Sequence, residues 1–299
     1  MRKLRRVEKG SAYLVTKKCN DDLFFLVPDP MVDMILLFSM LAFAERHKVV
    51  IHAFCFLSNH FHMVVTDRSG RLPDFMRDFL CNSSKALKVR LEESRSIWSS
   101  SRYSAVRLLD LNAAERKIVY TLLNPVRAKL VGSAKEWPGL TSARWKVGDV
   151  IVAQRPPLFF TPEKFPDEVS TRLVPVSSSF GETAKRSEAR IQELLVEETR
   201  EVQREMKAAG ESFAGVQAVL RTARTKRSTH AVCTRNPRFA TTDKALLKRA
   251  IEEDVEFHRR HIEAKARYLA GDRQVLFPTG TYWYRALLRV RVERSRSSA

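Results

Sequence analysis

The fold is decided by the stretch Val49-Val50-Ile51-His52-Ala53-Phe54-Cys55-Phe56-Leu57-Ser58-Asn59-His60-Phe61-His62-Met63-Val64-Val65-Thr66. It contains two runs of strand length that are rich in β-branched and aromatic residues, which favour extended structure. Between the two runs stands Ser58-Asn59, a pair typical of tight turns. The stretch therefore predicts an antiparallel hairpin at the centre of a sheet.

The segments around this hairpin alternate between strand and helix patterns. Residues 11–18 are rich in β-formers, and residues 31–46 carry apolar side chains at helical spacing without an internal Pro or Gly. After the hairpin, residues 72–91 have the pattern of an amphipathic helix, and residues 112–123 predict another helix, which Asn124-Pro125 interrupts. This order predicts an α/β (α+β) fold in which helices pack on an antiparallel sheet.

The second half of the chain differs in composition from the first. Residues 151–182 combine several prolines with Ser177-Ser178-Ser179, which is typical of a boundary or of a linker that follows the surface. Residues 183–209 and 242–270 are charge-rich and lack Pro, so they predict helices. We therefore expect a domain over 1–150, a Pro/Ser-rich linker over 151–182 and a mainly helical C-terminal region over 183–299.

The chain carries a large excess of positive charge. Its 53 Lys and Arg residues against 34 Asp and Glu residues give a net charge of +19. Such an excess favours a polyanionic partner, because binding to a phosphate backbone releases counterions. DNA, RNA and an anionic membrane surface all fit this property. No apolar run approaches the roughly 20 residues of a membrane-spanning helix, so we expect no membrane partner.

The compartment is indicated by the N-terminal residues and by the cysteines. The basic segment Met1–Arg6 leads into Glu8-Lys9-Gly10 and not into an apolar core, so a secretory signal is not expected. We therefore expect a cytoplasmic protein. The cysteines lack the paired spacing of a disulfide framework or a thiolate zinc site, and buried free thiols are expected at Cys19, Cys55, Cys81 and Cys233.

His60 and His62 are the candidate metal ligands. Residues two apart on a strand point to the same face, so the two imidazoles lie side by side while Phe61 enters the opposite face. Neutral imidazole nitrogens bind divalent metal ions. A third ligand has to come from elsewhere in the chain and is not identified. The alternative is an ordinary half-exposed strand that holds no ion.

The histidine segment resembles the signature of REP-associated tyrosine transposases, which belong to the single-tyrosine HUH transposase superfamily. In that signature a hydrophobic strand enters an Asn-His-hydrophobic-His turn and strand, as in Ser58-Asn59-His60-Phe61-His62. The resemblance spans about residues 10–145. The other matching segments are Ala12–Thr16, Trp98–Tyr103, the stretch Tyr120–Val131 with its Asn124-Pro125-Val126-Arg127-Ala128, and Glu136-Trp137-Pro138.

The resemblance implies a fold and an activity. Members of this family adopt a ferredoxin-like α/β sandwich and cut single-stranded DNA, usually beside a hairpin, through a tyrosine that becomes linked to the 5′ phosphate. His60 and His62 match the ligands of the divalent ion, Mg²⁺ or Mn²⁺, that polarises the scissile phosphate. The partner implied is single-stranded or hairpin DNA.

The nucleophile is the point at which the chain departs from this pattern. The resemblance places it on the helix after the histidine strand, yet residues 72–96 contain no tyrosine, and the matching position is Ser83. Three interpretations stay open. Tyr103 takes over the role; Ser83 or a metal-bound water attacks; or the chemistry is lost and a DNA-binding regulator remains.

Five basic residues are candidate DNA contacts. Arg127 and Lys129 follow the Asn124-Pro125 break, where a solvated basic turn is the alternative explanation. The others are Arg102, beside Tyr103, and Lys85 and Lys88, on the helix expected to cover the metal site. The sequence thus predicts a transposase-like protein that binds single-stranded or hairpin DNA. Metal-dependent strand cleavage and rejoining, a catalytically inactive regulator, and a metal hydrolase acting through bound water are the alternatives for its activity.

Overall fold

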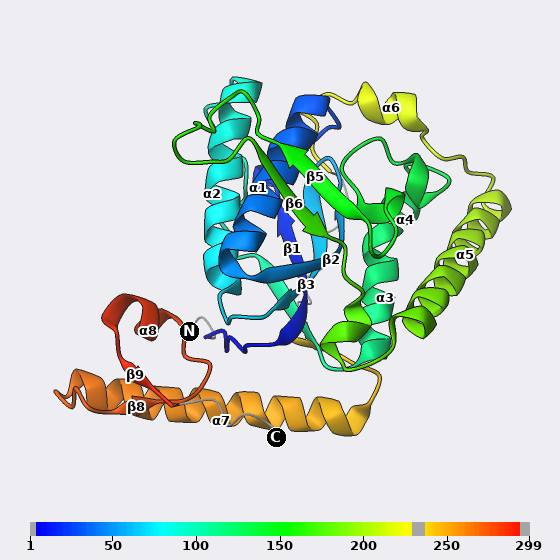
Figure 1. The fold of residues 1–299 in the computed structure, drawn as a ribbon. Coiled ribbons are helices and arrows are strands. Elements are labelled where there is room, and N and C mark those ends of the chain that lie inside the picture. Colours follow the sequence, from blue (N-terminus) through cyan, green and yellow to red (C-terminus); the bar gives the residue numbers. More distant parts are fainter. Residues whose placement is uncertain (1–3, 229–236, 294–299) are drawn as a thin grey trace.

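The structure is a computed structural model that describes residues 4–228 and 237–293. The first half of the chain alternates strands and helices, and the second half is mostly helical (Figure 1). The elements are β1 (Ser11–Lys18), α1 (Pro30–His47), β2 (Val49–Phe56), β3 (His60–Asp67), α2 (Leu72–Leu91), β4 (Ser104–Leu108), α3 (Leu111–Leu122), α4 (Asn124–Arg127), β5 (Val150–Gln154), β6 (Glu168–Arg172), α5 (Ala184–Ala208), α6 (Val216–Leu220), β7 (Phe239–Ala240), α7 (Lys244–Leu269), β8 (Leu276–Phe277), α8 (Trp283–Leu288) and β9 (Arg291–Val292).

The main sheet has the strand order β2-β3-β1-β4-β7. Strands β2, β3, β1 and β4 are antiparallel to their neighbours, and with α1 and α2 as the connections they have the ferredoxin-like topology. This confirms the predicted α/β (α+β) fold with helices packed on an antiparallel sheet. The short strand β7 adds to the edge, parallel to β4, and comes from the C-terminal region.

The predicted hairpin is formed by β2 and β3. Val49 pairs with Asp67 and Phe56 with Phe61, and Ser58-Asn59 makes the tight turn in which the Leu57 N–H donates to the His60 carbonyl at 2.8 Å. The register shifts between Ile51 and Ala53, so β2 carries a bulge at His52. The turn fixes the register of β3 and with it the face to which each histidine points.

Two apolar cores lie on the two faces of the sheet. Helices α1 and α2 cover one face, which we call the α1/α2 face, and pack on Phe61, Met63 and Val65 of β3. Helix α3 covers the other face, which we call the α3 face, and packs on Val64. Helix α5 lies along α3 on its outer side (Figure 1). Successive β3 side chains alternate between the two cores, as the pleat requires.

The region expected to be a linker is part of the core on the α1/α2 face. Strands β5 and β6 form an antiparallel pair that packs on α1. Ile151 and Phe160 are buried in the same core as the sheet, and Phe160 lies edge-on to Phe38 with ring centroids 5.2 Å apart. The prolines of this stretch therefore belong to a packed hairpin and not to a surface linker.

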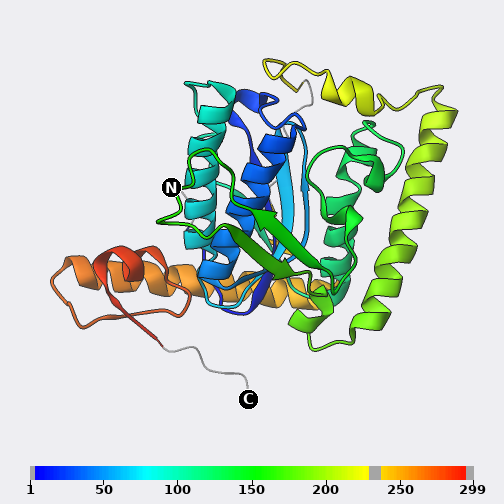
Figure 2. The same ribbon diagram turned by 45° about the horizontal axis from the view of Figure 1, so that its top comes forward.

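The C-terminal region returns to the sheet through β7 and then runs outward as α7. The two views in Figures 1 and 2 show α7 extending past the end of the sheet, with β8, β9 and α8 gathered at its far end. A small apolar cluster of Ala264, Val275, Phe277 and Val290 holds that end together. None of the helices formed by the described residues is both long and apolar enough to cross a membrane.

The cysteines that the structure describes are free thiols, but the expected burial is wrong for one of them. Cys19 and Cys55 are buried, and Cys81 is exposed. Cys233 lies outside the described residues.

Candidate active site

His60 and His62 lie side by side on β3 and face α3. Their ring centroids are 4.9 Å apart, and the ring planes are nearly perpendicular at 85°. His62 is buried with 5% of its surface exposed, while His60, at the start of the strand, is half-buried. The structure therefore brings the two imidazoles together, at the end of β3 next to the hairpin turn.

Both imidazoles are neutral near pH 7. Burial lowers the pKa of His60 to about 4, and the nearby Lys18 ammonium acts in the same direction. Burial, followed by His60 and Lys117, holds the pKa of His62 well below its usual range. A neutral imidazole keeps a nitrogen lone pair for a metal ion, so the pair is in the protonation state that binding requires.

The Nδ1 atoms of both rings are engaged by neighbouring polar side chains. The His60 Nδ1–H donates to Oδ1 of Asn59 at 2.7 Å, and Nδ1 of His62 is hydrogen-bonded to the Thr16 hydroxyl at 2.7 Å. In metal centres such contacts orient the ring and present Nε2 to the ion. Asn59 and Thr16 are therefore the positioning residues of the pair.

The helix over the histidine pair is α3, and not α2 as the sequence had suggested. The reason is the pleat of β3: α2 packs on the α1/α2 face, where Phe79 contacts Phe61 with ring centroids 5.6 Å apart. On the other side of the strand, the ring of Tyr120 on α3 lies 5.1 Å from the ring of His62, at 76° to its plane. A tyrosine thus stands beside the pair, carried by a different helix.

The local sequence explains how α3 places Tyr120. Asp110 caps the helix by accepting from the Ala113 N–H at 2.7 Å, and Pro125 follows its end. Ile118 and Leu122 are buried on the α3 face of the sheet, which fixes the rotation of the helix. Tyr120 is partly buried and packs against the same core, where its ring contacts that of His62.

Two cations lie close to the Tyr120 ring. The Lys117 ammonium is 5.3 Å from its centroid, and the Arg127 guanidinium is 5.9 Å away. Burial lowers the pKa of Lys117, and Arg127 adds to this. Within the described part of the chain, Lys117 forms no ion pair with a carboxylate. The surroundings of the histidines and the tyrosine are therefore suited to an anionic group.

The donor set fits a divalent ion with two imidazole ligands. Residues 4–228 and 237–293 contain no group of three or more His, Cys, Asp or Glu that could hold a metal. Asn124, whose side chain is hydrogen-bonded to His60, brings a further side-chain oxygen close to the pair. An ion held here would take its other ligands from water or from a phosphate.

The structure does not bring Ser83 or Tyr103 to the histidine pair, because both lie on the α1/α2 face. Ser83 is fully buried; its hydroxyl donates to the Phe79 carbonyl at 2.6 Å and accepts from the Trp98 indole at 3.3 Å. Tyr103 packs against the core on the α1/α2 face, and burial raises the pKa of its phenol.

The basic residues expected to contact DNA are distributed over three places. Arg127 pairs with Glu198 of α5, and Lys129 pairs with Glu211, so both lie in ion pairs beside the α3 face. Lys85 and Lys88 lie on α2, away from the histidines, and Lys88 donates to the Ser94 carbonyl at 2.8 Å. Arg102 is exposed at the start of β4. The structure thus places Arg127 nearest to the candidate site.

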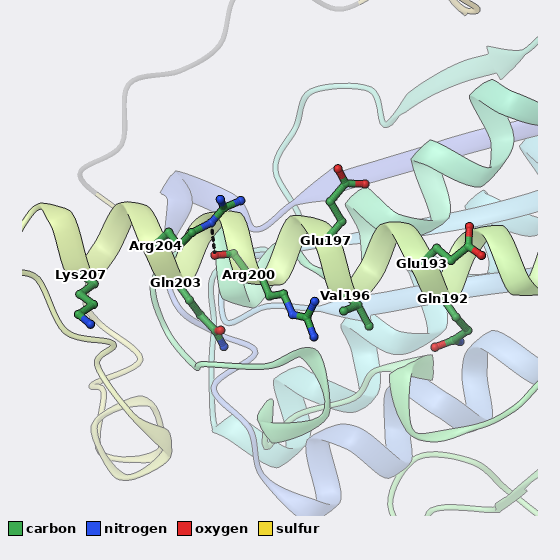
Figure 3. A pocket seen from close by; sticks show the side chains of 8 residues that line it. All are labelled: Gln192, Glu193, Val196, Glu197, Arg200, Gln203, Arg204 and Lys207. Atoms are coloured by element: carbon green, nitrogen blue, oxygen red, sulfur yellow. Dashed lines mark hydrogen bonds between the residues drawn. The ribbon is translucent and has the colours of Figure 1, made fainter.

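A hollow of about 980 Å³ runs along the outer side of α5, away from this chemistry. Figure 3 shows its eight labelled side chains, all from one helix, with acidic and basic groups mixed along the surface. Such a surface has neither paired metal ligands nor a single sign of charge. The histidine pair with Tyr120 is therefore the better candidate.

The importance of Tyr120 was missed in the sequence. Tyr120 precedes Asn124-Pro125 by four residues in a segment that matched the family pattern, but the nucleophile was sought on the helix next to the histidine strand. The signal that would have found it is the tyrosine that stands four residues before the Asn-Pro-Val-Arg-Ala segment. Because Tyr120 and His62 are nearly 60 residues apart along the chain, no local sequence pattern predicts their contact.

Comparisons with known proteins give structural neighbours. No protein-family model and no curated protein matches the chain. A REP-associated tyrosine transposase bound to a REP hairpin matches over 48% of this chain and 83% of its own, with 18% identity and a TM-score of 0.40. Its description names the family whose sequence motifs this chain resembles over about residues 10–145. A protein of Deinococcus radiodurans R1 described as a transposase matches over 36% of this chain and 85% of its own, with 15% identity and a TM-score of 0.29. A likeness of this extent assigns no activity, which has to be argued from the chain's own residues.

Proposed function

We propose that this chain is a transposase-like protein that binds single-stranded or hairpin DNA and cleaves the strand with Tyr120 as the nucleophile. The observation that carries the proposal is the 5.1 Å contact between the rings of Tyr120 and His62. A phenol, two neutral imidazoles and two cations then share one end of the sheet. Of the tyrosines considered, Tyr103 lies on the opposite face, so the geometry favours Tyr120.

The reaction is a transfer of the phosphoryl group to the phenol. The Tyr120 oxygen attacks the scissile phosphorus; the new oxygen–phosphorus bond forms as the bond to the 3′ oxygen breaks. The proton lost from the phenol is balanced, through solvent, by the proton that the leaving 3′ oxygen gains. The product is a 5′ phosphotyrosine and a free 3′ hydroxyl, and reversal of the step rejoins the strands without ATP.

The chain's own residues position the reactants. Lys117 and Arg127 attract the phosphate and stabilise the negative charge that accumulates as the phosphorus is attacked. Asn59 and Thr16 hold the imidazoles of His60 and His62 in place. An Mg²⁺ or Mn²⁺ ion bound by these imidazoles would withdraw charge from the scissile phosphate.

The test is the formation of a covalent protein–DNA adduct. Purified protein is incubated with 5′-labelled and 3′-labelled single-stranded hairpins and Mn²⁺, and the products are separated under denaturing conditions. We expect a label to stay with the protein only when it lies on the 3′ side of the cut. Tyr120→Phe abolishes the adduct, whereas the matched Tyr103→Phe leaves it unchanged.

The other outcomes contradict the proposal in distinguishable ways. Free cleavage products without an adduct indicate a hydrolase that acts through water. Salt-sensitive binding of hairpins without cleavage indicates the inactive regulator. An adduct that survives in Tyr120→Phe but is lost in Tyr103→Phe assigns the nucleophile to the other face of the sheet.

A further inference from the structure

A second cavity, of about 230 Å³, opens at the edge of the sheet on the α1/α2 face, opposite the histidine pair. We call it the arginine pocket. Four parts of the chain build it: residues of the N-terminal segment 4–8, Tyr13 of β1, residues of β4 and of the segment before it, and the C-terminal residues 237–239 together with Asp254 of α7. The C-terminal region thus completes a cavity that the first domain alone leaves open on one side.

The arginine pocket contains more positive than negative charge. Its acidic residues are Glu8 and Asp254, and its basic residues are Arg5, Arg6, Arg102, Arg107 and Arg238. Glu8 accepts ion pairs from two of these arginines, Arg6 and Arg107, each at 2.7 Å, and Asp254 pairs with a third, Arg238.

Two other guanidinium groups of the pocket are not paired with Glu8 or Asp254. Among the described residues, Arg5 and Arg102 have no carboxylate partner. Arg5 is nevertheless held in place: it donates to the Tyr103 carbonyl at 2.6 Å and stacks over the Tyr103 ring at 4.1 Å. A positioned guanidinium keeps its remaining N–H donors free for a ligand. The pocket thus has a fixed cation in Arg5 and an exposed one in Arg102.

The geometry points to a phosphate group as the ligand, and we propose that the arginine pocket binds one phosphate of a DNA strand outside the cleavage site. Guanidinium groups match the geometry of phosphate oxygens. The cavity is below the size range of sites for drug-sized molecules and suits a group of one nucleotide unit. The assignment to phosphate stands on the pocket alone, while the assignment to a DNA strand rests on the proposed function.

The inference gives the C-terminal region a role. Arg107 N–H donates to the Arg238 carbonyl at 2.9 Å, so β7 holds the wall of the pocket against β4. Arg238 also donates to the Leu4 carbonyl at 2.8 Å and so ties the N-terminal segment to the same wall. A strand anchored here would be held on the face of the sheet opposite to the one where it is cut.

The experiment measures binding in the full chain carrying Tyr120→Phe, so that strand cleavage does not interfere. Three probes are titrated: inorganic phosphate, a nucleoside 5′-monophosphate and a single-stranded oligonucleotide too short to form a hairpin. The variants are Arg102→Gln and the Arg5→Gln/Arg102→Gln pair, and the matched control is Arg204→Gln, an exposed arginine of α5. Arg102→Gln removes an exposed side chain, so the fold is expected to persist, and thermal unfolding verifies this.

We expect the oligonucleotide to bind at least tenfold more weakly to the double variant, with no change in the control. The slope of log K against log salt should fall by about 0.7 for each single-strand phosphate contact removed. Unchanged binding in the double variant, or an equal loss in Arg204→Gln, would contradict phosphate binding by the arginine pocket. If inorganic phosphate or the monophosphate binds as tightly as the oligonucleotide, with the same loss in the variants, the bound phosphate need not belong to a DNA strand. That result would contradict the assignment to DNA. Binding is measured without a divalent ion, so the proposed metal-dependent cleavage does not occur and these results do not depend on which residue is the nucleophile.

Discussion

The ring of Tyr120 on α3 lies edge-on against the ring of His62 on β3, with the centroids 5.1 Å apart. Nearly 60 residues separate them along the chain. The contact exists because β3 directs its histidines to the face of the sheet that α3 covers. It is this relationship that turns a pair of potential metal ligands into a candidate active site.

Removal of either imidazole should remove the metal site. We expect His60→Ala and His62→Ala to lose Mn²⁺ binding, as measured by titration with electron paramagnetic resonance detection. Asn59→Ala, which frees the His60 ring from its hydrogen-bond acceptor, should weaken Mn²⁺ binding by about 10–100-fold. Equal affinities of the wild type and His62→Ala would contradict the assignment.

Lys117 should contribute to the cleavage step. Its ammonium lies 5.3 Å from the Tyr120 ring, where in the proposed reaction it would face the developing charge on the phosphate. We expect Lys117→Ala to slow adduct formation at saturating DNA about tenfold, which corresponds to about 1.4 kcal/mol of the activation barrier. The neighbouring Arg116 is exposed on the outer side of α3, and Arg116→Ala is the control. A rate that falls equally in both variants would show a general effect of surface charge.

Phe160 should stabilise the whole core on the α1/α2 face of the sheet. It is 2% exposed and contacts Phe38 and Phe165, with ring centroids 5.2 and 5.0 Å apart. We expect Phe160→Ala to lower the free energy of unfolding by about 3–5 kcal/mol, as measured by denaturant titration. Val152, on an exposed position of β5, is the control, and Val152→Ala should change it by less than about 0.5 kcal/mol. A small loss for Phe160→Ala would indicate a loosely attached linker.

His52 should make the stability depend on pH. Burial lowers its pKa to about 4, while its ring is bonded to the Val174 carbonyl and to the Thr66 hydroxyl. The unfolded chain, with a histidine pKa near 6.5, binds the proton more readily, so stability is lost as the pH falls from about 6.5 towards 4. We expect His52 to contribute a loss of about 2 kcal/mol between pH 8 and pH 5.

The measurement is the difference in unfolding free energy between the wild type and His52→Gln across this pH range. Gln does not titrate, so the difference isolates the histidine from the carboxylates that also titrate. Parallel pH profiles of the two proteins would show that His52 is protonated without cost in the folded state.

Much of the sheet was predictable because its signals are local. Residues 11–18, 49–57 and 60–66 alternate or concentrate β-formers, and a turn pair stands between two of them. The helices over 72–91 and 183–209 likewise follow from periodicity and from the absence of Pro. The packed hairpin of β5 and β6 was not expected, because its prolines resemble a linker and its burial depends on contact with the distant helix α1.

The candidate site was likewise predictable only in part from the sequence. The alternation of a strand alone places His60 and His62 on one face, and the residue order in β3 therefore decided that they would be neighbours. Which helix covers that face is decided by the ferredoxin-like topology, since the connection from β3 through α2 to β4 crosses the opposite face. Consequently Ser83 is buried on the wrong side for contact with the histidines, and Tyr120 stands beside them. Local sequence specifies which way a side chain points from its own element; only the packing of elements far apart in the chain specifies what it meets there.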